Sequence, residues 1–261
     1  MANEKKLSID INGFEKAMKD QKKRARKSAK FDNYAQKIDW INVSNLKNSE
    51  FIGYDTAKCE ATIVRYAFQD EKIYLVLDKT PFYAESGGQV SDLGVISNDR
   101  LKLNVLDVKI INDEFVHICE GEFSTEKLQK VDCEIDYKRR QRTKKNHTAT
   151  HLLHQALRNI LGNHVEQKGS RVSSENFRFD FSHYSKLDQS DIISVENFVN
   201  SRIENSIDLI EERNVPLKKA QDNGAIGLFG EKYGDTVRTI KFGASYELCG
   251  GTPVSYTHLT L

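Results

Sequence analysis

The chain has 261 residues, of which 30% are charged and 38% are hydrophobic, and its formal net charge is only +1. This length accommodates two modest domains, and the near-neutral balance gives no general sign of a nucleic-acid partner. No apolar run reaches the roughly 20 residues that span a membrane, the N-terminus lacks a signal peptide, and the four cysteines form no CxxC pair. We therefore expect a cytoplasmic protein with reduced thiols and no membrane partner.

Residues 11–31, "INGFEKAMKDQKKRARKSAKF", predict an amphipathic helix with a narrow apolar edge and a basic remainder. A single helix cannot bury its own apolar stripe, so we expect this one to end a larger helical region and assign residues 1–38 to it. Basic helices of this kind are more often solvated faces than binding surfaces.

Residues 39–137 show the residue pattern of several short strands and are predicted to form a small β-barrel domain. The stretch "ATIVRYAFQDEKIYLVLDKT" predicts a hairpin that turns at Asp70 and Glu71. The stretch "LKLNVLDVKIINDEFVHICEGE" repeats the pattern and turns at Asn112 and Asp113. Several strands at this spacing are typical of a barrel.

A helical period returns at Lys138 and ends near Gly162, a plausible stop. Its apolar stripe consists of Leu152, Leu153, Leu157, Ile160 and Leu161. The following stretch, "HVEQKGSRVSSENFRFDFSH", alternates as a two-stranded hairpin does.

A long amphipathic helix is predicted over residues 188–214, with Asp188 or Ser190 as N-cap and Pro216 just beyond its end. The stretch "GDTVRTIKFGASYELCGGT" predicts one or two closing strands. The fold class is therefore α+β: a basic helix, a small β-barrel, and an α+β sandwich of helices on an antiparallel sheet over residues 138–253.

His147 and His151 lie one helical turn apart, so both imidazoles can reach one ion. Zinc takes neutral imidazole and thiolate ligands, usually four in a tetrahedron. HxxxH alone is a weak signal, and two hydrogen-bonded or solvated histidines are the simple alternative. A zinc protease is excluded, because Thr148 stands where the H-E-x-x-H motif requires the glutamate base.

Two further histidines lie nearby in the sequence. His154 is near the same helical face and is either a third ligand or a buried histidine with one hydrogen bond, and we prefer the buried histidine. His164 follows Gly162 and is interpreted as structural.

Four motifs in order resemble alanyl-tRNA synthetases. "NHTATHLLHQALRNILGNHVEQKGSRV" with "FRFDFSH" is similar to their editing domain, and "TPFYAESGGQVSDLG" to the barrel that precedes it. "GAIGLFGEKYGDTVR" and "ELCGGT" resemble the closing motifs, so the resemblance runs from about Leu7 to Thr252. The basic helix resembles the end of the tRNA-recognition region, which free-standing editing deacylases are not expected to carry; the longer synthetase is therefore the preferred parent.

The resemblance implies one zinc ion held by HxxxH and CxxxH motifs, here His147, His151 and Cys249. The fourth ligand should be a histidine, but this chain has Pro253, which offers no lone pair. The tail "VSYTHLTL", residues 254–261, resembles an in-frame translation of a transposon-type sequencing adapter. We expect it to be non-native and Pro253 to be a junction codon; the alternative is a natural variant that uses His258.

The resemblance also implies the reaction: hydrolysis of the ester that joins serine or glycine to the alanine tRNA. Thr150, Gln167 and Ser170 carry over as catalytic-pocket residues that recognise the amino acid and position water; the alternative is that each is an ordinary polar residue on the surface of its strand or helix. The role of Asp180 is left open between a structural carboxylate and a hydrogen-bond partner of a histidine. The ligase domain, which activates alanine with ATP and Mg²⁺, is expected to be absent, with Met1 an internal methionine.

The stretch "KRRQRTKK" precedes the histidine pair and is expected to contact tRNA phosphates or, alternatively, to be a solvated helix start. Its basic residues are Lys138, Arg139, Arg140, Arg142, Lys144 and Lys145. The glycines of Glu85–Gln89 are expected to allow a close approach of the barrel to the site or to the tRNA end; the alternative is a purely structural turn, which is the more frequent role of such glycines. A second hypothesis remains: a catalytically silent fragment that at most binds tRNA, because position 253 lacks its ligand.

Overall fold

The structure is a computed structural model that describes residues 10, 13–20, 38–46, 49–124, 130–205, 208–227 and 233–255. Most of the predicted basic helix lies outside these residues, as do His258 and part of the "GAIGLFGEKYGDTVR" motif. Residues 13–20 are helical and exposed. No helix in the described ranges has the length and apolar character needed to cross a membrane.

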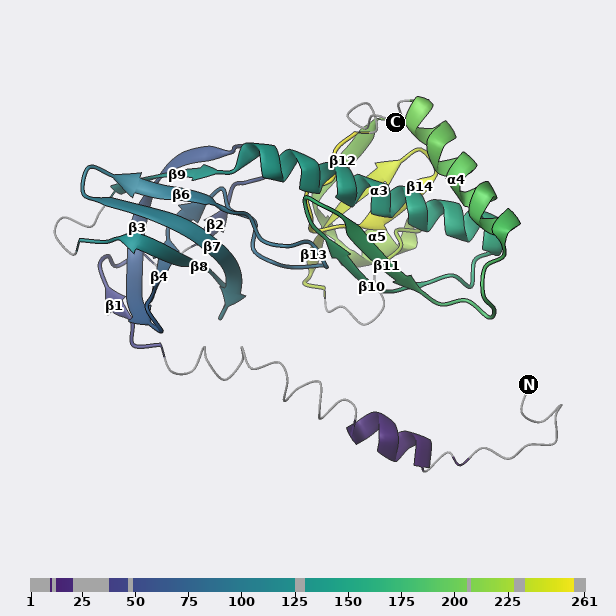
Figure 1. The fold of residues 1–261 in the computed structure, drawn as a ribbon, viewed down its shortest axis with the longest axis horizontal. Coiled ribbons are helices and arrows are strands. Elements are labelled where there is room, and N and C mark those ends of the chain that lie inside the picture. Colours follow the sequence, from purple (N-terminus) through teal and green to yellow (C-terminus); the bar gives the residue numbers. More distant parts are fainter. Residues whose placement is uncertain are drawn as a thin grey trace.

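The first region is a closed antiparallel barrel, as predicted (Figure 1). Its strands follow the order β3 (Lys58–Gln69), β4 (Lys72–Leu77), β8 (Glu114–Glu122), β7 (Leu101–Ile111), β6 (Gly94–Asn98) and β9 (Lys130–Ile135), and β9 pairs again with β3. Strand β1 (Ile41–Asn42) pairs with β3, and β2 (Glu50–Phe51) pairs in parallel with β5 (Lys79–Thr80).

Both predicted hairpin turns occur. Asp70 and Glu71 join β3 to β4 with φ values of 50° and 60°, and Asn112 and Asp113 join β7 to β8 with 51° and 63°. Left-handed backbone at both central positions matches the twist of the flanking strands, and Asp and Asn tolerate it better than most residues. The barrel interior is filled by Ile63, Leu75, Leu77, Phe82, Ile96 and Leu103.

The second region is organised around helix α3 (Tyr137–Leu161), which leaves the barrel and runs the length of that region (Figure 1). The Asp136 side chain caps its start by accepting from the Arg139 amide at 2.9 Å, and Gly162 ends it with φ 114°. The buried side chains of Leu152, Ala156 and Leu157 form its apolar face.

Helix α3 lies against two small antiparallel sheets. Strands β12 (Leu209–Pro216), β13 (Thr236–Phe242) and β14 (Ser245–Leu248) form one, and β10 (Gln167–Val172) with β11 (Phe177–Phe181) forms the other. Leu152 packs with Ile240 and Phe242 of the first sheet, while α4 (Gln189–Glu204) covers the second apolar cluster of α3. The prediction of an α+β sandwich is confirmed.

The predicted helix over residues 188–214 is wrong in its second half. Helix α4 starts at the predicted N-cap Asp188, whose capping box with Asp191 is complete, but it ends at Glu204. Residues 209–216 form β12 instead, because this segment pairs along β13. Pro216 ends that strand and begins the short helix α5 (Leu217–Asp222).

The two regions are joined by a buried ion pair and by backbone pairing. Arg140 of α3 is 3% exposed, and its guanidinium donates to both Asp92 oxygens and to the carbonyls of Gly53 and Pro81. The Gly-rich loop of the barrel, residues 85–90, pairs with the end of β10: Val172 N donates to the carbonyl of Gly88 at 2.7 Å, and Val90 N to that of Val172 at 3.0 Å. The barrel therefore reaches into the second region.

Candidate metal centre and its pocket

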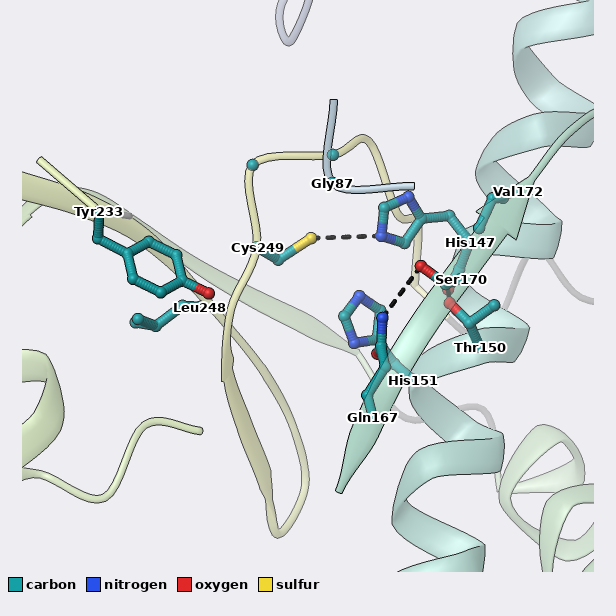
Figure 2. A pocket seen from close by; sticks show the side chains of 12 residues that line it. Gly87, His147, Thr150, His151, Gln167, Ser170, Val172, Tyr233, Leu248 and Cys249 are labelled. Carbon is teal, nitrogen blue, oxygen red and sulfur yellow. Dashed lines mark hydrogen bonds between the residues drawn. The ribbon is translucent and has the colours of Figure 1, made fainter. Parts of the chain in front are cut away.

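Helix α3 and the segment after β14 bring the three predicted metal ligands together. His147, His151 and Cys249 are all buried, and their ligand atoms lie within 4.8 Å of one another. The two rings are stacked with centroids 5.0 Å apart, and Cys249 Sγ is 3.4 Å from His147 Nε2. Figure 2 shows the sulfur approaching the two imidazoles from the opposite wall of a pocket.

Glu247 holds His151 in place. Its buried carboxylate accepts from His151 Nδ1 at 2.7 Å and from Ser245 Oγ at 2.8 Å, with His154 Nδ1 at 3.3 Å. His154 is thus the buried, hydrogen-bonded histidine preferred from the sequence. Glu247 itself was missed, although it lies on β14 two residues before Cys249, and the period of two in an extended chain could have revealed that both face the same side.

The charges of the site favour a bound cation. Burial alone would lower the pKa of His151, but the Glu247 carboxylate and Cys249 raise it to about 10. Burial would raise the pKa of the Cys249 thiol, but His147 and His151 hold it well below its usual range. Burial also opposes ionisation of Glu247, and His151 and His154 nevertheless lower its pKa. The group is therefore a thiolate and a carboxylate balanced by protons that a metal ion can replace.

The nitrogen atoms are arranged as metal ligands are. Each Nδ1 faces an oxygen, Glu247 for His151 and Gln89 for His147, which leaves each Nε2 on the pocket side. His151 Nε2 is buried without a hydrogen-bond partner among the described residues. Two imidazoles with oriented Nδ1–H groups and one thiolate are a donor set that suits zinc. The residues present therefore fit the metal implied by the resemblance.

The loop that carries Cys249 is braced from behind. Arg238 donates to the carbonyls of Cys249 at 2.8 Å and Gly251 at 3.0 Å, and Tyr54 of the barrel donates to that of Gly250 at 2.5 Å. The Arg238 guanidinium lies over the Tyr54 ring, 4.6 Å from its centroid. Sequence reasoning missed both residues, because nothing local to them marks so distant a contact.

The three predicted pocket residues line the same open pocket, whose empty space, counted out into the solvent, is about 450 Å³. Ser170 Oγ accepts from Gln167 Nε2 at 3.0 Å (Figure 2). Thr150 donates its hydroxyl to the His147 carbonyl at 2.6 Å. The Gly-rich loop approaches closely, as expected: a Cβ on Gly88 would lie 2.2 Å from Ser170 Oγ. Asp180, whose role was left open, pairs with Arg178 on β11.

Residues 1–139 match the family model described as tRNA synthetases class II (A). The chain belongs to this family. Its alanine–tRNA ligase relatives include those of Christiangramia forsetii, 46% identical over 261 residues, and Chlorobaculum tepidum, 41% identical over 270 residues. These alignments cover 95% and 97% of this chain but only 29% and 30% of the relatives, so the chain spans less than a third of their length.

In this class II synthetase chain, Pro253 lies between two anchored neighbours. Gln89 holds Thr252, and Thr148 Oγ1 accepts from Val254 N at 2.8 Å while donating to the Val254 carbonyl at 2.7 Å. Residues 251–254 are buried. The backbone at position 253 is thus fixed close to α3.

The predicted phosphate-contact residues divide into two groups. The prediction for Arg140 is wrong, because its guanidinium is buried against Asp92 and is not available to tRNA. Lys138 and Arg142 are exposed, while Arg139, Lys144 and Lys145 are half-buried. These five remain candidates.

Proposed function

We propose that this chain carries the editing site of an alanine–tRNA ligase, a zinc-dependent esterase that hydrolyses alanine tRNA mischarged with serine or glycine. One observation carries the proposal: His147, His151 and Cys249 converge in the cavity that Thr150, Gln167 and Ser170 also line. Ligation of alanine with ATP and Mg²⁺ is proposed for a longer protein of which these residues form one part.

The proposed reaction is attack of water on the ester carbonyl, which breaks the bond to the terminal ribose and releases the amino acid and tRNA. A bound zinc ion would supply a positive charge that polarises the ester or orients the substrate. His147, His151 and Cys249 are the residues that would hold it, and Glu247 fixes the orientation of His151. Gly88 packs directly against Ser170, whereas a Cβ on Gly87 would meet nothing within 4 Å, so the turn leaves open space for the tRNA end at Gly87.

The hydrogen bonds inside the pocket suggest how the amino acid is recognised. Thr150 has committed its proton to the His147 carbonyl, so its oxygen remains an acceptor for a substrate hydroxyl or ammonium. Ser170 accepts from Gln167 and therefore retains a proton to donate. The serine hydroxyl can pair with such groups and the alanine methyl cannot, a difference worth about 1–3 kcal/mol.

The start of α3 is proposed to contact tRNA phosphates. Burial lowers the pKa of Lys144, and the neighbouring Arg140 and Arg238 lower it further, so an anion would relieve repulsion there. Lys138 and Arg142 extend this basic edge on the exposed side of the helix. Such contacts contribute affinity without reading sequence.

The decisive experiment compares this chain with a Pro253→His variant, measuring zinc content and hydrolysis of Ser-tRNA(Ala) side by side. We expect weak zinc retention and weak hydrolysis for the given chain and a gain in both for the variant. Ala-tRNA(Ala) should survive in both, and a Cys249→Ala variant is the matched negative control. Stoichiometric zinc without hydrolysis in the Pro253→His protein would contradict the proposed activity.

A second candidate function is a tRNA-binding fragment without catalysis, favoured by the missing donor at position 253. It predicts that the given chain binds alanine tRNA yet hydrolyses no ester. Restoring the histidine distinguishes the two proposals, because a fragment silent for other reasons gains nothing from it.

A further inference from the structure

Gln89 belongs to the barrel but contacts the candidate metal centre of the other region. We propose that Gln89 is a positioning residue of that centre: it fixes the tautomer of His147 and clamps the segment that presents position 253. This inference rests on the proposed zinc site and extends it, because it makes the barrel part of the metal centre.

The amide of Gln89 has one orientation that satisfies its neighbours. Its side chain is fully buried, and its Oε1 lies 2.9 Å from the backbone N of Thr252 and 2.7 Å from His147 Nδ1. A backbone N–H can only donate, so the atom facing it must be the amide oxygen. The other end, Nε2, donates to Thr252 Oγ1 at 2.9 Å.

This orientation determines where His147 carries its proton. An amide oxygen can only accept, so His147 Nδ1 must be the protonated nitrogen, and the lone pair of the neutral ring sits on Nε2. Nε2 is the atom that faces Cys249 Sγ. Gln89 thereby does for His147 what Glu247 does for His151, and each ring receives its partner from a different region.

The same side chain also sets the path of the ligand loop. Thr252 is bound to Gln89 through both its backbone and its hydroxyl, and Thr148 holds Val254, so residue 253 is fixed on both sides. The backbone of Gly251 passes so close to His147 that a Cβ there would lie 2.0 Å from its Cε1. Releasing Gln89 would free one end of this clamp.

Gln89 is itself held by backbone pairing. It forms a β-bridge with Val172 of β10, and its amide and carbonyl both pair with Ser86 across the Gly87–Gly88 turn. Its side chain therefore starts from a fixed backbone, as a positioning role requires. Ser170 lies two residues from Val172, so one barrel loop touches both the pocket and the metal ligand.

Three substitutions test the proposal, each made in the full chain and in the Pro253→His background. Gln89→Leu removes the acceptor, whereas Gln89→Glu keeps an acceptor for both His147 Nδ1 and Thr252 N. Gln141→Leu is the control: it lies on α3, the helix that carries His147, but outside the site. Zinc affinity is measured by competition with a chromogenic chelator, and the coordination geometry by the visible absorption of bound Co²⁺.

We expect Gln89→Leu to bind zinc about 10- to 100-fold more weakly and to change the Co²⁺ spectrum, the usual cost of losing a partner of a ligating histidine. Gln89→Glu should stay within a few-fold of the parent, and Gln141→Leu should equal it. Thermal unfolding with a chelator present checks that all variants fold.

Equal zinc affinity in folded Gln89→Leu and parent overturns the inference. So does an equal loss in Gln89→Leu and Gln89→Glu, because then the acceptor is not what matters. If neither parent background binds zinc, the proposed metal site fails instead, which is a separate and recognisable result.

Discussion

The barrel and the second region each bury histidines, but with opposite consequences. In the barrel, His117 Nδ1 lies 3.0 Å from the Leu75 carbonyl and Nε2 lies 2.7 Å from Thr80 Oγ1, so the neutral ring is fully satisfied. On α3, His151 has one nitrogen on Glu247 and the other without a hydrogen-bond partner among the described residues. A buried histidine with two neutral partners has no nitrogen left to bind a metal ion. A buried histidine beside a carboxylate and a thiolate lies where a bound cation is favoured.

The largest expected effect is on zinc content, which should depend on His151 and not on His117. In the Pro253→His background, which is expected to hold zinc, His151→Ala removes a ligand and should abolish stoichiometric zinc, a greater loss than any change of a supporting residue. His117→Gln lies in the barrel interior and should retain the zinc content of the parent. Metal analysis after gel filtration measures both, and zinc retained by His151→Ala would remove the distinction.

The next effect concerns the buried charge pair that joins the regions. Arg140→Met leaves Asp92 buried without its partner and should lower the free energy of unfolding by about 3–5 kcal/mol. Arg142→Met, two residues along the same helix and exposed, should change it by less than about 1 kcal/mol. Urea denaturation of both variants checks the contrast, and similar losses would show that Arg140 is not the anchor.

A smaller effect follows from the pH dependence of the barrel. Burial lowers the pKa of His117 from 6.5 to about 4. Its stabilising contribution is therefore complete above pH 6.5 and is lost as the pH falls towards 4, with about 2 kcal/mol gone at pH 5. Comparing parent and His117→Gln in urea at pH 7 and pH 5 isolates this contribution. A parent whose pH dependence equals that of the variant would contradict it.

The smallest effect is expected at the basic start of α3. Lys145→Ala should weaken tRNA binding by less than tenfold and reduce the slope of log affinity against log salt by about 0.7–0.9, the share of one phosphate contact. Thermal stability should stay unchanged. Filter binding at several salt concentrations provides the measurement, and an unaltered slope would exclude Lys145 as a contact.

Local patterns predicted much of the fold. Both hairpin turns, helix α3 with its glycine stop, and the N-cap Asp188 follow from spacing and residue type within a few positions. The helix predicted beyond Glu204 failed because the stretch 209–216 is decided by β13, which lies some twenty residues further along. The hydrophobic period within residues 188–214 therefore could not show that their second half pairs with β13.

The candidate site shows the same division. Spacing alone singled out His147 and His151, and the resemblance to the synthetase family supplied Cys249, the third residue that the structure brings to them. Glu247 was within reach of strand periodicity. Gln89 lies in the glycine-rich stretch that was expected to approach the site, but its contact with His147 was not predicted, and Tyr54 of the barrel leaves no local signal. Arg140 was misjudged because a run of basic residues does not show which member of the run turns inward.

The wide sequence separation of the loop contacts imposes an order on assembly. Gln89 and Thr252 are 163 positions apart, and Tyr54 and Gly250 are 196 apart. During synthesis the barrel can close long before Cys249 leaves the ribosome, while contacts of such long range form slowly and late. The metal centre is therefore the last part of the molecule to be completed. Until then, His147 and His151 lie on a helix before the strands and the loop that contact it have been synthesised.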